Sequence, residues 1–412
     1  MAPLVQSVTQ FIAFRSSAPF RFDIPNASKN AGQAGKAGQV YLTNVQQFAR
    51  QALQRDAKVQ IARERVRLPC LPIARWPTED FQGARLLVLL PGQALGDCTQ
   101  ATMALQALIE ARGVKSITIA CAGPAFDIIA SNRRLDVRSL WIAYDEVQRF
   151  DHVIDLGHMS ETWNIDVWPV DFEAAMLDAF NIPPSSNYPP TARPLPTDRV
   201  PSIGIFPLAS SPLRTLPAEV IHQVVEALSQ HGDLTVCLNS NQGQGRQMSA
   251  LLASVHQKAT IVENFPTIAA MVTAIRDFDY AIFADSGPAH IAKLFATPGV
   301  AIYTSAPSGV LQGRFRNLTA YDVPYEGDYC AAPCGLAKVR QATDGRIGCM
   351  GSLELTLADL PDVPRDSNPE AVQRLIADPV PCVKALIADR TDLAAFIDAD
   401  IERRLRSPTT GG

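Results

Sequence analysis

The sequence lacks the features that mark membrane and nucleic-acid-binding proteins. The longest apolar runs of its 412 residues, such as 86–90, fall far short of the about 20 residues that a membrane helix needs. There is no basic excess, since 37 Lys and Arg stand against 41 Asp and Glu, which gives a formal charge of −4. We therefore expect no transmembrane segment and no nucleic-acid partner, although the sequence allows peripheral association with a membrane.

Short catalytic signatures are missing as well. The sequence contains no GxGxxG, no GxxxxGK[ST], no GxSxG, no HExxH and no CxxC. These absences argue against a nicotinamide-dependent Rossmann enzyme, a P-loop ATPase, a hydrolase with a nucleophile elbow and a dithiol redox protein. The N-terminus has no basic residue before Arg15 and no clear cleavage site, so we expect a cytoplasmic protein whose eight cysteines are mainly thiols.

What is present suits two buried cores. Hydrophobic residues make up 47% of the chain and charged residues 19%. The expected order is an N-terminal accessory region (1–80), a first Rossmann-like α/β domain (81–180), a proline-rich linker (181–201), a second Rossmann-like domain (202–360) and C-terminal helices (361–412). One of these helices is expected to pack back on the first domain.

Strand and helix patterns alternate twice along the chain. In the first half we expect strands at 86–90, 116–120, 135–143 and 152–156, with a turn at 91–97 and a helix at 99–112 that ends at Gly113. The accessory region is expected to hold a helix at 45–63. In the second half we expect strands at 202–206, 234–238, 280–284 and 299–303, and helices at 217–231, 247–255, 267–277 and 288–295. Two helices, 370–377 and 383–404, follow.

Asp97 is the first candidate site residue. It follows the strand expected at 86–90, and the carboxyl ends of strands in open α/β sheets face the ligand crevice. A carboxylate there can accept a proton from a substrate hydroxyl. The alternative is that Asp97 caps the next helix, because Asp is a favoured N-cap.

The second half offers two further candidates behind its strands. The segment 285–290 (DSGPAH) opens a helix, whose N-terminal N–H groups and dipole favour a phosphate. The segment 208–214 (LASSPLR) combines hydroxyl groups with an arginine that suits a diphosphate. The alternative for 285–290 is a capped helix without a ligand, and the alternative for 208–214 is a solvated loop. The candidate residues are Ser210, Ser211, Arg214, Asp285, Ser286, Gly287, Pro288 and His290.

Four cysteines near the C-terminal end are the candidate metal ligands: Cys330, Cys334, Cys349 and Cys382. The loop around the first three has little apolar periodicity, and thiolates holding iron or zinc would staple such a loop. The C-x3-C spacing is not that of a standard zinc pair. Buried cysteines that act as small apolar side chains are the alternative.

Two segments make the chain resemble the heptosyltransferase-like glycosyltransferases of family 9. Residues 87–104 (LVLLPGQALGDCTQATMA) are similar to the family's first strand, glycine turn and Leu-Gly-Asp segment. Residues 284–303 (ADSGPAHIAKLFATPGVAIY) are similar to its Asp-Thr/Ser-Gly-Pro-x-His helix start and the following strand. The resemblance covers about residues 85–355.

The resemblance implies a GT-B fold, with two Rossmann-like domains facing across a cleft. It implies an inverting, metal-independent transfer from a nucleotide-diphosphate sugar, typically ADP-heptose, to a glycan, lipid-linked or protein acceptor, as in lipopolysaccharide biosynthesis. Asp97 then matches the catalytic base, and Asp285 matches the residue that contacts the donor sugar. The donor-phosphate turn corresponds to 286–290, and Arg214 stands where the family usually has a lysine.

Other parts of the chain depart from this pattern. The family's Gly-x-Glu ribose loop has no carboxylate counterpart in 239–246, where Gln242 is the nearest candidate. The cysteines and residues 1–80 resemble protein-modifying members with an iron finger and an extra N-terminal domain. Catalysis is expected to need no cofactor. The alternatives are a nucleotide-sugar epimerase, which would turn over donor alone, and a non-catalytic GT-B protein that binds a nucleotide sugar or a partner.

Overall fold

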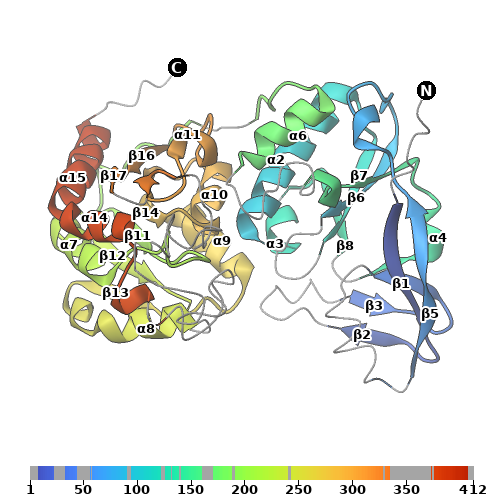
Figure 1. Ribbon diagram of the computed structural model, residues 1–412, viewed down its shortest axis with the longest axis horizontal. Helices are drawn as coiled ribbons and strands as arrows, with labels where there is room; N and C mark the ends of the chain where they lie inside the picture. Colours follow the sequence, from blue (N-terminus) through green and yellow to red (C-terminus); the bar gives the residue numbers. More distant parts are fainter. Residues whose placement is uncertain are drawn as a thin grey trace. The chain divides into compact units, whose positions relative to one another are not determined.

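The protein folds into two compact units, each described here by itself. The computed structural model describes residues 8–22, 33–43, 56, 58–90, 94–121, 126–130, 132–138, 141–159, 170–187, 191–239, 243–327, 330–334, 373 and 375–406. Unit 1 comprises Met1–Asn164, Phe172–Tyr188 and Pro266–Val272. Unit 2 comprises Ile165–Asp171, Pro189–Phe265 and Thr273–Gly412. Figure 1 labels the elements of both units.

A four-stranded parallel sheet forms the centre of unit 1. Its strands are β6 (Arg85–Leu90), β7 (Ser116–Cys121), β8 (Leu135–Arg138) and β10 (His152–Asp155), in the order β10-β6-β7-β8. The apolar run of β6 is buried throughout, as expected for a strand covered on both faces. Helix α2 (Leu95–Arg112) follows β6 and packs against α6 (Phe172–Phe180) (Figure 1). It ends at Gly113, whose φ of 60° suits glycine.

The accessory region is a β structure where it is described. Strands β1 (Val8–Ser16), β4 (Val40–Thr43), β5 (Val59–Pro69) and β9 (Ile142–Ala143) form an antiparallel sheet in the order β5-β1-β4-β9. A small hairpin, β2 (Phe20–Phe22) with β3 (Gln33–Gly35), accompanies it. One face of the sheet packs on the parallel sheet, because Phe11 and Leu42 share a core with Leu87 and Leu89.

The helix predicted at 45–63 is therefore wrong over 59–63, and 44–55 and 57 lie outside the described residues. Val59 and Ile61, and further along Val66 and Leu68, alternate with polar residues, which is the period of a strand. The single strand predicted at 135–143 is also two. Strand β8 joins the parallel sheet, whereas β9 pairs with β4 in the accessory sheet.

Unit 2 holds a six-stranded parallel sheet in the order β13-β12-β11-β14-β15-β16. The strands are β11 (Ser202–Phe206), β12 (Asp233–Cys237), β13 (Ala259–Val262), β14 (Tyr280–Ala284), β15 (Gly299–Tyr303) and β16 (Leu318–Asp322). The helices between them are α7 (Ala218–Leu228), α8 (Gly243–Leu251), α9 (Ile268–Asp277), α10 (Gly287–Leu294) and α11 (Ser308–Leu311). The predicted α/β class is confirmed in both units.

Two C-terminal helices complete unit 2. Helix α14 (Pro381–Ala388) and helix α15 (Arg390–Arg406) lie beside α7 (Figure 1). Leu386, Leu393, Ile397 and Ile401 enter the core of unit 2. One C-terminal helix was predicted to pack on the first domain, but both α14 and α15 pack in unit 2. Among the described residues, α2 is the longest helix, and none is both long and apolar enough to cross a bilayer.

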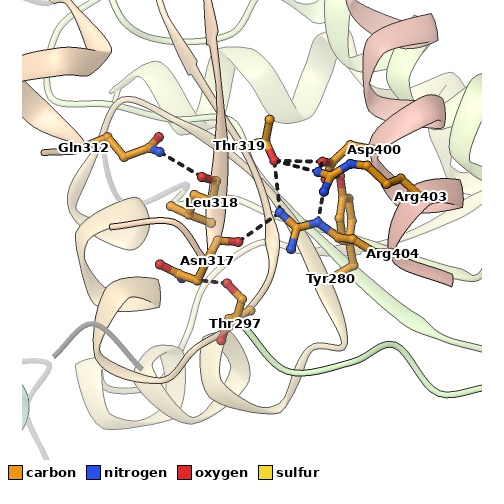
Figure 2. A network of polar contacts seen from close by, with 9 residues as sticks. All are labelled: Tyr280, Thr297, Gln312, Asn317, Leu318, Thr319, Asp400, Arg403 and Arg404. Carbon is orange, nitrogen blue, oxygen red and sulfur yellow. Dashed lines mark hydrogen bonds and ion pairs between the residues drawn. The ribbon is translucent and has the colours of Figure 1, made fainter. Parts of the chain in front are cut away.

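A buried polar network fixes α15 to the sheet (Figure 2). Asp400, 4% exposed, accepts hydrogen bonds from the Tyr280 hydroxyl on β14 and the Thr319 hydroxyl on β16, each at 2.7 Å. It also accepts one from Nε of Arg404 at 2.7 Å and pairs with Arg403. Burial opposes ionisation of Asp400, but the charge and hydrogen bond of Arg404 and the hydrogen bonds from Thr319 and Tyr280 together outweigh it. The pKa of Asp400 therefore lies below its ordinary value.

The proline-rich segment 181–201 is held at both ends. Ser185 donates to Glu110 on α2 at 2.7 Å. Further along, Arg193 donates to the Phe278 carbonyl oxygen at 2.8 Å, and Arg199 makes two hydrogen bonds with Asp279, at 2.6 and 2.7 Å. The division between the units falls inside this segment, between Tyr188 and Pro189.

Candidate functional site

The order of strands marks one place in unit 2 as a ligand site. From β11 the chain builds outward in one direction through β12 and β13, and in the other through β14, β15 and β16. Between β11 and β14 the strand order therefore reverses. In open α/β sheets, ligands bind at the carboxyl ends of the strands at such a switch point. The two segments singled out in the second half, 208–214 and 285–290, follow these two strands.

The two segments meet through one ion pair. Nη1 of Arg214 lies 3.4 Å from Oδ2 of Asp285, and their side chains are 15% and 2% exposed. Burial raises the pKa of Asp285, and the charges of Arg214 and Lys293 oppose that rise. Nε of Arg214 is also buried, and it has no hydrogen-bond partner among the described residues. Arg214 thus has donor capacity left after it has paired with Asp285.

The turn after β11 is held by its own hydroxyl groups. Oγ of Ser210 accepts a hydrogen bond from Nη2 of Arg214 at 2.8 Å. Ser211 is fully buried, and its Oγ accepts from the Leu213 N–H at 3.3 Å. Thr215 accepts from the Ala209 N–H at 3.1 Å. Ser210 and Ser211, which were predicted to bind the nucleotide-sugar donor, therefore stabilise the turn that carries Arg214.

The start of α10 leaves its N–H groups without a side-chain cap. Ser286 is the N-cap in an extended conformation, but its Oγ donates to the Ala284 carbonyl oxygen at 3.2 Å rather than accepting from the helix. Pro288 lies in the first turn and has no N–H. The Gly287 N–H is one of the first-turn groups that lack an intrahelical partner. This end of α10 can accept an anion.

A buried base lies one turn further along α10. His290 is 9% exposed, and its Nδ1 lies 3.1 Å from Nζ of Lys293, which is 1% exposed. Burial, Lys293 and Arg214 together hold the pKa of His290 well below its ordinary value. Lys293 was not among the site residues predicted from the sequence. The signal was a lysine inside the apolar run 289–296, three residues after His290.

Two more residues near this place were missed. Ser305 follows β15, the neighbour of β14, and is 1% exposed, and its Oγ has no hydrogen-bond partner among the described residues. Gln244 on α8 accepts from Thr215 at 2.8 Å. Both follow strands of the same sheet, which is the signal that would have found them. The predicted ribose contact Gln242 lies outside the described residues.

Asp97 lies at the corresponding place in unit 1. The strand order β10-β6-β7-β8 reverses between β10 and β6, and α2 follows β6 directly. The N-cap of α2 is Ala94, so Asp97 is the third residue of the helix and half-buried. Asp97 is therefore not the N-cap residue. Residues 95–97 of the turn predicted at 91–97 are helical, and 91–93 lie outside the described residues. The carboxylate of Asp97 is in the first turn, where the helix dipole favours negative charge.

Three of the four candidate metal ligands lie on neighbouring elements. Strand β18 (Ala331–Ala332), flanked by Cys330 and Cys334, pairs with β17 (Tyr325–Glu326). Strand β17 packs against α14, which carries the buried Cys382. Cys349 lies outside the described residues. Within the described part of the chain, no three His, Cys, Asp or Glu side chains gather as a metal ion requires.

Comparison with known proteins confirms the resemblance. Residues 169–328 match the family model "Glycosyltransferase family 9 (heptosyltransferase)", and the GT-B class predicted from the resemblance is the fold type of this family. No curated protein sequence matches the chain.

Three solved structures illustrate the similarity. A family 9 glycosyl transferase of Veillonella parvula DSM 2008 is 16% identical over 59% of this chain and 87% of its own, with a TM-score of 0.46. ADP-heptose lps heptosyltransferase II of E. coli is 12% identical over 71% and 98%, with a TM-score of 0.44. The iron-containing dodecameric glycosyltransferase TibC of enterotoxigenic E. coli H10407 is 11% identical over 98% and 100%, with a TM-score of 0.47.

Proposed function

Because residues 169–328 match the family model of the family 9 glycosyltransferases, we propose that the chain transfers a heptose from ADP-heptose to an acceptor hydroxyl. The donor is a nucleotide-diphosphate sugar, and the acceptor is a glycan, a lipid-linked glycan or a protein. Unit 2 binds the donor, and unit 1 supplies the base. The transfer inverts the anomeric carbon.

The charge at the carboxyl ends of β11 and β14 is the observation that carries this proposal. Arg214 and Lys293 bring two cations to the place where Asp285 supplies one carboxylate. Buried charge is costly unless it is compensated, so the site favours a further negative group. A diphosphate provides that charge, and its oxygens can accept from the unsatisfied Nε of Arg214 and from the start of α10.

The proposed chemistry uses these groups directly. The acceptor oxygen attacks the anomeric carbon from the side opposite the diphosphate, and the bond from that carbon to the diphosphate oxygen breaks. The electron pair leaves with the diphosphate, whose growing charge Arg214 and the N-terminus of α10 stabilise. Asp97 accepts the proton of the acceptor hydroxyl. Because Arg214 and the N-terminus of α10 stabilise the leaving group, the proposed step uses no divalent ion.

The test is the substitution Asp97→Asn. Asparagine keeps the size of the side chain but cannot accept the proton, so we expect turnover to fall about 10²- to 10⁴-fold. Binding of ADP, measured by calorimetry, should stay within about twofold of the wild type, because Asp97 is not a donor ligand. Asp151→Asn, an exposed ion-pair residue of unit 1, is the matched control and should keep both properties. Near-normal turnover of Asp97→Asn would show that Asp97 is not the catalytic base.

The cysteines form a separate part of the proposal. Cys330, Cys334, Cys349 and Cys382 would hold a structural iron or zinc through thiolates, which would tie the β17–β18 hairpin to α14. The ion would supply stability and take no part in the transfer. Elemental analysis of the wild type should find one metal ion per chain, and Cys334→Ser should lose it. Equal metal content in both proteins would contradict this assignment.

A further inference from the structure

A buried lysine contributes positive charge to the candidate donor site but takes no part in the proposed transfer step. Lys293 is 1% exposed on α10. Its Nζ donates to the Leu311 carbonyl oxygen at 2.5 Å and lies 5.1 Å from the centre of the Phe315 ring. Its third contact is Nδ1 of His290, at 3.1 Å. A buried ammonium is costly unless its hydrogens find partners, so each of these contacts matters.

With Lys293 charged, the contact with His290 sets where the imidazole proton sits. An ammonium group has three donors and no acceptor, so it can bond to Nδ1 only through the lone pair of that nitrogen. In a neutral imidazole whose Nδ1 accepts, the proton is on Nε2. An imidazolium would turn an N–H toward the ammonium and place two positive groups in contact.

The surroundings favour the neutral ring as well. Two cations, Lys293 and Arg214, act on His290, and burial adds to their effect, so the pKa of His290 lies well below its ordinary value. Asp285, the carboxylate of this cluster, is already paired with Arg214. The ring is therefore neutral near pH 7.

We propose that Lys293 is a positioning residue of the donor site, which holds His290 as the neutral tautomer that carries its proton on Nε2. His290 then offers the site a hydrogen-bond donor and no lone pair. If the proposed function holds, the recipient of that hydrogen bond is an oxygen of the donor diphosphate. The opposite tautomer would direct a lone pair at an anionic oxygen, which repels it.

The tautomer can be measured without any ligand. In the full chain labelled with ¹⁵N-histidine, long-range ¹H–¹⁵N spectra separate the two neutral tautomers and the imidazolium. The signals of His290 are those that disappear in His290→Gln. We expect a single Nε2–H tautomer near pH 7 in the wild type. An Nδ1–H tautomer, an equal mixture or an imidazolium at His290 would overturn the proposal.

The variant Lys293→Met adds a second readout. Methionine is similar in length and keeps the contact with Phe315 but cannot donate, so we expect the single tautomer to be lost. In calorimetric titration with ADP, Lys293→Met should weaken binding about tenfold, and by only about twofold in a His290→Gln background, because Gln carries an N–H whatever its neighbour.

Two outcomes of the titration separate the two proposals. Equal losses of ADP affinity in both backgrounds would mean that Lys293 acts through its charge or its packing, which overturns the positioning role. If ADP binds to no variant and not to the wild type, the proposed function fails, and the tautomer spectrum of the wild type still decides the role of Lys293.

Discussion

The guanidinium of Arg214 shows what single residues contribute to the site. Its Nη1 pairs with Asp285, its Nη2 donates to Ser210, and its buried Nε has no partner among the described residues. Two directions thus fix the side chain, and the third leaves a buried donor without a partner among the described residues. A lysine has one side-chain nitrogen and could not reproduce this planar fork.

Arg214→Ala should weaken binding of ADP by about 2 kcal/mol or more, because it removes a cation and leaves Asp285 buried without its partner. The loss of folding stability should grow from pH 4 to pH 7. The pKa of Asp285 is raised in the folded protein, so this residue favours folding only below its unfolded pKa, and that contribution is lost as pH rises through the folded value. Without Arg214 the pKa rises further, and ionisation at pH 7 costs more.

Calorimetry and urea unfolding at the two pH values measure these effects. Arg276→Ala is the matched control, because Arg276 is an exposed arginine of the same unit that pairs with Asp277. It should change ADP binding little and stability by at most about 0.5 kcal/mol. Unchanged ADP affinity in Arg214→Ala would remove Arg214 from the donor site.

At the scale of elements, buried polar contacts attach the last helix to the second sheet. Asp400 connects α15 to β14 and β16 through Tyr280 and Thr319, and two arginines of α15 balance its charge (Figure 2). The apolar side chains of α15 add Leu393, Ile397 and Ile401 to the core. The helix is thereby part of the second α/β layer, where it backs the strands that carry the site.

Asp400→Asn should lower the free energy of unfolding by about 2–4 kcal/mol at pH 7, because two arginines lose their buried counter-charge. The pKa of Asp400 is depressed in the folded protein. Its contribution is therefore present above the unfolded pKa, about 3.9, and is lost as pH falls through the lower folded value.

Urea unfolding between pH 7 and pH 3 should show that the difference in the free energy of unfolding between the wild type and Asp400→Asn becomes smaller as the pH falls. The control is Glu402→Gln, which removes an exposed carboxylate of the same helix that pairs with Arg406. It should cost at most about 0.5 kcal/mol. A penalty for Asp400→Asn that stays constant over this pH range would contradict the role given to its charge.

Strand β15 depends on one glycine. A Cβ added to Gly299 would lie 1.8 Å from the carbonyl oxygen of Ala281 on β14, so the two strands would have to separate. We expect Gly299→Ala to destabilise the protein by about 2–3 kcal/mol in thermal or urea unfolding. Gly309→Ala is the control, because nothing lies within 4 Å of its added Cβ. Similar stability of the two variants would disprove the close approach.

The elements that the sequence predicts best are the buried strands. Strands β14 and β15 have the predicted bounds, because every one of their residues is buried and their apolar runs are continuous. The edge strands β13 and β16 were missed, since most of their residues are only partly buried and Thr or Asp interrupts their apolar pattern. Strand β5 was predicted as part of a helix because its arginines make the alternation of apolar and polar residues hard to recognise.

At the scale of the whole molecule, the two proposed roles, the base and the donor site, belong to different units. Asp97 lies in unit 1, and the residues of the candidate donor site lie in unit 2. The chain has a formal charge of −4, yet Arg214 and Lys293 give the switch point of unit 2 a local excess of positive charge. The binding of an anionic donor is thus a property of one place and not of the overall charge.

At this scale the sequence predicts the position of the site and not its full composition. The two candidate segments, 208–214 and 285–290, were predicted from the sequence, whereas the strand order that places them beside one switch point comes from the structure. Ser305 lies outside the motifs, and Lys293 lies in the segment 284–303 but was not singled out there. Burial, which the sequence does not give, marks both residues. The pairing of Arg214 with Asp285, 71 residues apart in sequence, also requires the folded sheet.

Calorimetric titration of the full chain with ADP, UDP, GDP and CDP in the presence of a chelator tests the proposed donor site of unit 2. We predict that ADP binds in preference to the other three, that Arg214→Ala loses this binding and that Asp97→Asn keeps it. Absence of binding for all four nucleotides, or undiminished ADP binding in Arg214→Ala, would contradict a nucleotide-sugar site at the ends of β11 and β14.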